Sequence, residues 1–223
     1  RQRVVLLSAF LSPFRSGAEA CAEEVAARLG DRFDITIVTA KLQRLSSISF
    51  QLLGGKGVRV IRVGIGCSFD KWLFPFLAPF VVQRRKPDAV HAVLETFAGA
   101  ALLFCRWVYP RAWRILTLQT TNRSFLKCPI VRSAHKVTAI SSFLGDVARK
   151  CGREAVLIPN GVDFHAIRGA CDRHPKVPGR ILFVGRLEKM KGVETLLAAC
   201  TDVADKFPQV YLRIVGEGSL RTL

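Results

Sequence analysis

The chain has 223 residues, half of them hydrophobic, and a formal net charge of +17. This length and apolar content suffice for one large or two modest folded domains, which excludes an intrinsically disordered protein. No apolar run reaches the roughly 18 residues that a membrane-spanning helix needs, so the composition also argues against a membrane-spanning protein.

Apolar segments rich in Val, Ile and Leu recur along the first part of the chain, and helical patterns separate several of them. Nearly continuous apolar runs are typical of parallel strands that are covered on both faces. The alternation predicts βαβ units in a doubly wound α/β sheet. The expected strands are 3–10, 34–40, 57–63, 88–93, 114–119, 136–140 and 155–160, and the expected helices are 18–29, 96–108 and 141–151.

The segment 67–87 combines aromatic, proline and basic residues. Pro75 and Pro79 are expected to break or kink a single helix. Two interpretations stay open: a core segment packed on the sheet, or a surface that touches a membrane, aromatic on one side and basic at its end. The residues near one helical face are Phe69, Trp72, Leu73, Phe76 and Phe80, and Arg84, Arg85 and Lys86 follow.

The alternation of predicted strands and helices stops at 164–179, where charged residues, prolines and a glycine replace the apolar pattern. A second βαβ unit follows, with strand 181–185, helix 191–206 and strand 210–216. We therefore expect a first domain over 1–165, a linker over 166–179 and a second domain over 180–223. One βαβ unit cannot cover both faces of its strands, so we expect the second domain to be the first part of a larger one.

Acidic residues are absent between positions 96 and 145. Such a basic stretch attracts anions, which include nucleic acid, phosphate groups and acidic membranes, although a merely solvated basic surface explains it as well. No nucleic-acid-binding motif accompanies it, so a nucleic-acid partner is the weaker prediction. The cations of the stretch are Arg106, Arg111, Arg114, Arg123, Lys127, Arg132 and Lys136.

The seven cysteines stand singly along the chain, without the close pairs or nearby histidines of a zinc site. This pattern predicts reduced, buried thiols in a cytoplasmic protein. No two acidic residues stand two positions apart, so the chain has no Asp-x-Asp metal motif.

The loop from Gly185 to Gly192 joins a predicted buried strand to a predicted helix and carries Arg186 and Lys191. Ligands of open parallel sheets bind at the carboxyl ends of strands, and helix N-termini favour anions. The two cations could therefore hold a diphosphate without a metal. Two solvated cations in an ordinary loop are the alternative.

Several segments, taken in order, resemble family 4 glycosyltransferases of the GT-B fold. "SAFLSPFRSGAEACAEEVAARL" resembles the family's first strand, glycine loop and helix, and "KPDAVHAV" resembles its strand entering the cleft. "VTAISSFLGDVARKCG" and "AVLIPNGVDF" resemble the end of its first domain. "FVGRLEKMKGVETLL" and "LRIVGEGSLR" resemble its donor-binding domain.

The resemblance implies two Rossmann-like domains, the first binding the acceptor and the second a UDP-, GDP- or ADP-sugar. It also implies sugar transfer with retention of configuration, without a metal or other cofactor, to a lipid, glycan or other acceptor. The protein is expected in the cytoplasm, with possible peripheral contact to an anionic membrane surface.

The resemblance also assigns site residues. In the donor site it places Gly17, Gly185, Arg186, Lys191, Gly192, Glu217 and Gly218. In the acceptor cleft it places Ser16, His91, Gln119 and Asn122, with a structural role as the alternative for His91.

This sequence departs from the family at three points. Ser16 and Gly17 stand where the family has two glycines, and Gln119 stands where it often has a histidine. The family's paired glutamates are expected beyond Leu223, so no catalytic residue is assigned. The rival hypothesis is therefore a non-catalytic protein of similar fold that binds a phosphorylated or nucleic-acid ligand in a basic cleft.

Two local interpretations complete the predictions. Ser141 opens a helical pattern and is expected to be its N-cap. Glu19 and Glu23 are one helical turn apart and are expected on a solvated helix face.

Overall fold

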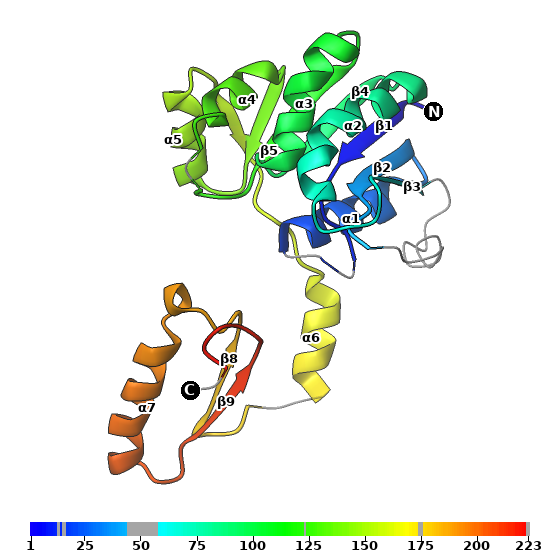
Figure 1. Ribbon diagram of the computed structural model, residues 1–223. Coiled ribbons are helices and arrows are strands. Elements are labelled where there is room, and N and C mark those ends of the chain that lie inside the picture. Colours follow the sequence, from blue (N-terminus) through cyan, green and yellow to red (C-terminus); the bar gives the residue numbers. More distant parts are fainter. Residues whose placement is uncertain (13, 15–16, 44–57, 123, 174–175, 222–223) are drawn as a thin grey trace. The chain divides into compact units, whose positions relative to one another are not determined.

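The computed structural model describes residues 1–223 except 13, 15, 16, 44–57, 123, 174, 175, 222 and 223. Its chain forms two compact units, Arg1–Gly161 and Val162–Leu223 (Figure 1). The predicted linker 166–179 is not entirely without regular structure, because helix α6 (Phe164–Arg173) occupies its first part. This helix belongs to the second unit.

The first unit is built on a parallel sheet of seven strands in the order β3-β2-β1-β4-β5-β6-β7. The predicted strands all form, and most of them begin and end within two residues of the expected positions. Every neighbouring pair in this sheet is parallel. The strands are β1 (Arg3–Leu7), β2 (Asp34–Ala40), β3 (Val58–Val63), β4 (Ala89–Val93), β5 (Trp113–Leu118), β6 (Lys136–Ala139) and β7 (Ala155–Leu157).

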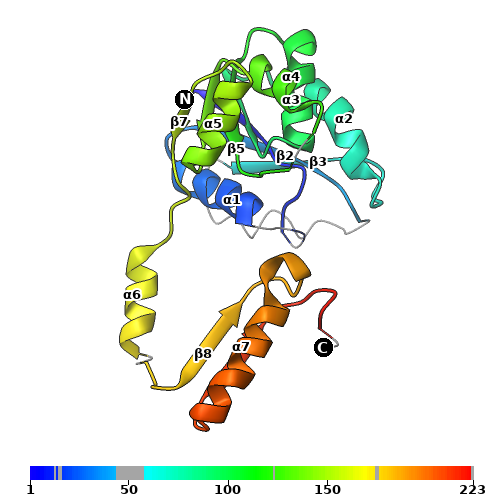
Figure 2. The same cartoon turned by 90° about the vertical axis from the view of Figure 1, so that its left-hand side faces the viewer.

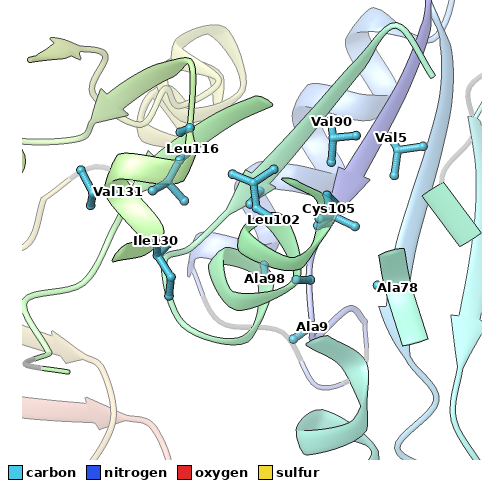
Figure 3. Close-up of a cluster of buried hydrophobic side chains, with 14 of the residues drawn as sticks. Val5, Ala9, Ala78, Val90, Ala98, Leu102, Cys105, Leu116, Ile130 and Val131 are labelled. Carbon is cyan, nitrogen blue, oxygen red and sulfur yellow. The ribbon is translucent and has the colours of Figure 1, made fainter. Parts of the chain in front are cut away.

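Helices cover both faces of this sheet, as a doubly wound sheet requires. One face packs against α1 (Gly17–Leu29), where Ala26 meets Leu6 and Ile37. The other face carries the larger core, which includes Val5, Val90, Leu102 and Leu116 (Figure 3). The helices on that face are α2 (Asp70–Arg85), α3 (Phe97–Val108), α4 (Lys127–Ser133) and α5 (Ser142–Lys150).

Pro75 and Pro79 were expected to break or kink a single helix, and a break does not occur, because α2 runs uninterrupted through both. Each proline removes a backbone donor at a cost of about 3 kcal/mol or more. Burial offsets this cost, since Phe74, Ala78 and Val82 are fully enclosed against the core. The other side of α2 leaves a row of aromatic side chains exposed: Phe69, Trp72, Phe76 and Phe80. The segment thus packs on the sheet and still presents an aromatic surface.

The amino-terminal end of α2 is held by Asp70, a carboxylate without solvent exposure. It accepts hydrogen bonds from the backbone N–H groups of Ile65, Gly66 and Cys67 at 3.0, 2.7 and 3.3 Å. Burial works to raise the pKa of Asp70, but these hydrogen bonds outweigh it and keep the pKa below its ordinary value. The carboxylate therefore fixes the loop between β3 and α2.

Not all cations of the acid-free stretch are solvated. Arg114 is buried and donates from Nε to the carbonyl of Ser133 at 2.9 Å, and Lys127 is buried as well. Arg106, Arg111, Arg132 and Lys136 stay exposed. The basic surface is thus smaller than the sequence suggests.

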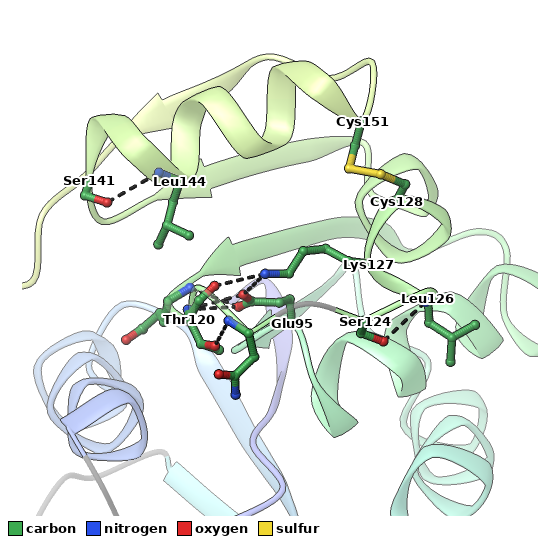
Figure 4. Close-up of polar contacts among 11 residues, drawn as sticks. Glu95, Thr120, Ser124, Leu126, Lys127, Cys128, Ser141, Leu144 and Cys151 are labelled. Atoms are coloured by element: carbon green, nitrogen blue, oxygen red, sulfur yellow. Dashed lines mark hydrogen bonds and ion pairs between the residues drawn. A yellow bond between two sulfur atoms is a disulfide. The ribbon is translucent and has the colours of Figure 1, made fainter. Parts of the chain in front are cut away.

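The expectation that all cysteines are reduced is wrong for one pair. Cys128 and Cys151 form a disulfide that joins α4 to the residue after α5 (Figure 4). The two cysteines are far apart in the sequence and meet because the two helices are neighbours in the fold. Cys21, Cys67, Cys105 and Cys200 are free thiols.

The second unit contains the predicted strand–helix–strand arrangement after α6. Strands β8 (Arg180–Val184) and β9 (Tyr211–Val215) are parallel (Figure 1). Helix α7 (Val193–Lys206) connects them and is seen beside β8 in Figure 2. The two strands leave large apolar side chains exposed: Leu182, Val184, Tyr211 and Val215. Among the described residues of this unit, the buried apolar side chains are Leu187 and Val193.

Candidate functional site

The carboxyl edge of the first sheet is organised by Glu95, which follows β4. This carboxylate is 3% exposed. The preceding Leu94 has a φ of +83°, which is a strained value for a bulky side chain. Backbone hydrogen bonds from Leu94 N–H to Thr117 and from Gly99 N–H to Leu94 hold this turn. The fold therefore fixes the direction in which Glu95 leaves the strand.

Glu95 joins the ends of two neighbouring strands through an ion pair and backbone hydrogen bonds. Its Oε2 accepts from Gln119 N–H at 3.0 Å, and its Oε1 accepts from Thr120 N–H at 3.2 Å. Lys127 Nζ lies 3.1 Å from Glu95 Oε1 and donates to the Thr120 carbonyl at 3.0 Å (Figure 4). The pair is almost fully enclosed, with side-chain exposures of 2% for Glu95 and 10% for Lys127. It positions the segment that follows β5.

Gln119, one of the predicted acceptor residues, lies in this segment. Its Oε1 is 3.4 Å from Asn160 Nδ2, which acts as the donor. Its buried Nε2 has no hydrogen-bond partner among the described residues. A buried donor without an acceptor is costly, by about 1–3 kcal/mol, unless a ligand or water completes it. Asn122, also predicted, is exposed nearby, and its backbone N–H donates to Thr120 Oγ1 at 2.8 Å.

His91 lies in the middle of β4, in register with Leu6 and Ile115. Its Nε2 is 2.7 Å from Thr117 Oγ1, which in turn lies 2.8 Å from Thr138 Oγ1. Burial lowers the pKa of His91 to about 4, so the ring is neutral at neutral pH. This environment agrees with the structural alternative, and a role toward the acceptor stays a prediction.

The first glycine loop is described only in part. Ser16 lies outside the described residues, whereas Gly17 is exposed at the first position of α1. The expectation of a solvated face for Glu19 and Glu23 is wrong, because they are only 4% and 7% exposed. Glu23 Oε1 accepts from the Ser12 N–H at 2.8 Å, so this acidic side supports the loop after β1.

The structure confirms the predicted role of Ser141 as the N-cap of α5. It has extended backbone geometry, and its Oγ accepts from the Leu144 N–H at 3.4 Å (Figure 4). The hydroxyl therefore has a structural function at this helix end.

In the second unit, the loop between β8 and α7 carries the predicted donor-binding cations. Arg186 lies two residues after β8, and its Nη1 is 2.9 Å from Glu188 Oε1. Lys191 ends a 3₁₀ helix (Lys189–Lys191) and is exposed. Gly192 follows with a φ of +69°, a conformation that favours glycine, and serves as the N-cap of α7. Both cations thus stand between a strand end and a helix N-terminus.

The loop after β9 packs directly on this loop. The backbone N–H of Leu187 donates to the Glu217 carbonyl at 2.8 Å. A Cβ on Gly218 would stand 2.3 Å from the Leu187 carbonyl oxygen, so only glycine fits this contact. The Glu217 carboxylate lies 2.6 Å from Arg221. The structure therefore brings the loop that carries Gly185 and Arg186 against the loop that carries Glu217 and Gly218, all of which the resemblance placed in the donor site. Lys191 and Gly192 follow in the same loop after β8.

Sequence reasoning missed Glu95 and the pairing role of Lys127. A usable signal existed for Glu95, since it is an acidic residue directly after a predicted buried strand. Nothing local marked Lys127 as its partner, because the contact depends on how α4 packs beside β4 and β5.

Two family models match the chain. "Glycosyltransferase Family 4" matches residues 15–165, and "Glycosyl transferases group 1" matches residues 172–222. Among curated relatives, the chain is 38% identical over 97 residues to a phosphatidyl-myo-inositol mannosyltransferase of Mycobacterium tuberculosis. That alignment covers 40% of this chain and 26% of the relative. The corresponding enzyme of Mycolicibacterium smegmatis is 37% identical over 97 residues.

Solved structures with the same fold share little sequence with this chain. Sucrose-phosphate synthase from Thermosynechococcus elongatus has a TM-score of 0.75 at 18% identity, covering 97% of this chain and 62% of that chain. Anabaena HepE in complex with UDP and glucose has a TM-score of 0.68 at 19% identity, covering 98% of this chain and 62% of that chain. These likenesses confirm the predicted GT-B type of α/β fold. The chain thus spans less than two thirds of these solved chains.

Within the part of the chain that the structure describes, no helix has both the length and the apolar character that crossing a membrane requires.

Proposed function

The chain belongs to glycosyltransferase family 4, and we propose that it takes part in transferring a sugar from a nucleotide-sugar to a lipid-bearing acceptor. The observation that carries this proposal is the pair of cations in the loop after β8, Arg186 and Lys191, packed beside the loop that holds Glu217 and Gly218. The family's donor diphosphate site is expected at this position.

The cations suit the leaving group of the reaction. As the bond between sugar and diphosphate breaks, negative charge grows on the departing nucleotide, and fixed cations stabilise it most at that moment. The loop is anchored at Leu187, which is 6% exposed and hydrogen-bonded to the residues after β9. Arg186 shares its charge with Glu188, so a bound diphosphate must compete with that carboxylate.

Transfer with retention of configuration and without a metal is part of the same proposal. It is motivated by the family resemblance and by the lack of an Asp-x-Asp pair in the sequence. The two cations of the loop would then supply the positive charge that a metal supplies elsewhere.

The lipid-bearing acceptor is supported by the curated relatives, whose name specifies phosphatidyl-myo-inositol. Gln119 is the acceptor-side residue that we favour, since its buried Nε2 lacks a partner among the described residues. A hydroxyl or phosphate oxygen of the acceptor would satisfy this donor.

The proposal also includes peripheral contact of the first unit with an anionic membrane. The exposed aromatic row of α2 ends at Arg84, Arg85 and Lys86, which suits an interface with acidic lipid headgroups. Each cation near such a surface contributes about 1 kcal/mol, and salt weakens it. Co-sedimentation with anionic vesicles should fall as salt rises. Equal binding to neutral vesicles would contradict this part.

The central experiment measures binding of UDP-, GDP- and ADP-sugars to the full-length protein by calorimetry, and sugar transfer to a lipid extract. Lys191→Ala should weaken donor binding about tenfold or more, the loss of one charged hydrogen bond. Arg186→Lys should also weaken it, because a point charge does not replace a bidentate fork.

Lys206→Ala is the matched control, since Lys206 is an exposed cation at the opposite end of α7. If both loop variants bind donor like the control, the donor-site assignment fails. Donor binding without any transfer would instead favour the non-catalytic rival.

A further inference from the structure

An apolar groove of about 460 Å³ lies on the first unit beside the carboxyl edge of its sheet. Residues of α2, α3, α4 and the segment before α4 form its walls. Its apolar lining consists of Trp72, Pro75, Phe76, Phe97, Ala100, Phe104, Phe125, Leu126 and Ile130. A volume of this size falls within the range of about 300–1,000 Å³ that small-molecule sites occupy.

The aromatic rings of α2 and α3 form a ladder along one wall of the groove. Trp72 and Phe97 meet edge to face with ring centroids 5.1 Å apart, and Phe76 and Phe104 meet at 5.0 Å. Successive rungs on α2 are four residues apart, which corresponds to about 6 Å along the helix. The groove thus runs along the helices, away from the strand ends.

The opposite wall carries an unusually exposed ring. Phe125 is 90% exposed, and Leu126 beside it is 36% exposed. Exposed apolar surface that lines a hollow marks an interaction site rather than a packing detail. Because the four rings of the opposite ladder are held in pairs, an apolar ligand would bury them at little cost in ordering.

The polar end of the groove coincides with the acceptor-side residues. Glu95, Thr96, Asn122 and Ser124 contribute to its lining, and they follow the carboxyl ends of β4 and β5. Among the described residues of the lining, Glu95 is the one acid, and Lys127 neutralises it. The groove therefore presents no uncompensated negative charge to a phosphate-bearing headgroup.

We propose that this groove holds one hydrocarbon chain, alkyl or isoprenoid, of the acceptor, with its polar head at the strand ends near Gln119. This inference rests on the proposed function and specifies a subsite for it. A protein partner fits the groove poorly. A helix is about 10–12 Å in diameter, and a stable interface buries about 800 Å² on each side.

The test uses monomeric amphiphiles, namely octyl, decyl and dodecyl phosphate below their critical micelle concentrations, with the alkyl maltosides as neutral-head counterparts. Calorimetry on the full-length protein should show affinity rising by up to about fifteenfold for each two methylenes, which is the value for fully buried hydrocarbon. The increment per methylene should be the same for both heads, and the phosphates should bind more tightly at every length.

Two groove variants and one control sharpen the test. Phe125→Ala should weaken dodecyl phosphate about fivefold or more without loss of stability, since this ring is almost fully exposed. Ala100→Phe should fill the groove and flatten the dependence on chain length. Phe143→Ala is the matched control, an exposed ring on α5 outside the groove, and should bind within about twofold of the parent.

Flat affinity across the chain lengths would overturn the proposal, as would an equal loss in the Phe143→Ala control. The proposal would also be overturned if the protein bound vesicles but not the monomeric amphiphiles, and if Phe125→Ala and Phe80→Ala reduced that vesicle binding equally. The surface would then be a membrane contact. Failure here is distinguishable from failure of the proposed function, because donor binding and its Arg186 and Lys191 variants report on the second unit. Binding of the alkyl phosphates without binding of a nucleotide-sugar would support the groove as a hydrocarbon site and reject the proposed transferase function.

Discussion

Replacement of Glu95 by alanine should destabilise the first unit more than any surface substitution. The carboxylate is 3% exposed and accepts hydrogen bonds from the N–H groups of Gln119 and Thr120. It also pairs with Lys127 at 3.1 Å. Its removal leaves a buried ammonium without its carboxylate, and breaking a buried pair in this way costs about 3–5 kcal/mol.

Replacement of Lys127, the other member of the pair, should lower the free energy of unfolding by less. Lys127→Met removes the cation, but Glu95 keeps its two backbone donors, so we expect a loss of about 1–3 kcal/mol. The double variant should be less destabilised than the sum of the two single variants. The difference should be about 1 kcal/mol or more, because each single variant strands the other group.

Denaturant unfolding followed by tryptophan fluorescence measures these changes in the right unit. The chain's three tryptophans, Trp72, Trp107 and Trp113, all lie in the first unit. An Arg186→Ala variant in the second unit serves as the control and should leave this transition unchanged. A loss below about 1 kcal/mol for Glu95→Ala, or strict additivity of the two single variants, would refute the reasoning.

Three further outcomes are expected. Asp70 has a folded-state pKa below its ordinary value, so the stability that it contributes is fully present above the ordinary pKa and is lost as pH falls through the folded value. The free energy of unfolding of Asp70→Asn, measured near pH 3 and pH 5, should therefore depend less on pH than that of the parent protein. Gly99→Ala should cost about 1–3 kcal/mol, since a Cβ there lies 2.7 Å from Ile130 Cγ2. Its control is Gly145→Ala, which has nothing within 4 Å of the added Cβ and should be neutral or stabilising when both variants are compared by thermal unfolding. Excess EDTA should leave sugar transfer by the full-length protein intact, and loss of transfer that manganese or magnesium restores would contradict metal independence.

The sequence alone was sufficient to predict the strands of the first sheet and the loop from Gly185 to Gly192 that joins a strand to a helix. The run 4–7 in β1 is apolar on both sides of the strand, and that local property already favours a parallel strand covered on two faces. The loop from Gly185 to Gly192 was also legible, because a strand end, two cations and a helix start follow one another within a few residues. Ser141 was predictable for the same reason, as its cap contact spans three residues.

Only the tertiary structure decided which side of each element is buried and which distant residues meet. On α2, the sequence pattern grouped the aromatic residues, but packing buried Phe74, Ala78 and Val82 and left Trp72 and Phe76 exposed. Glu19 and Glu23 were buried against expectation for the same kind of reason. The Glu95–Lys127 pair and the groove beside it depend on how β4, β5, α2, α3 and α4 meet. Secondary structure follows from periodicity within one segment, whereas a buried ion pair or a groove is a property of several segments packed together, and no single segment encodes it.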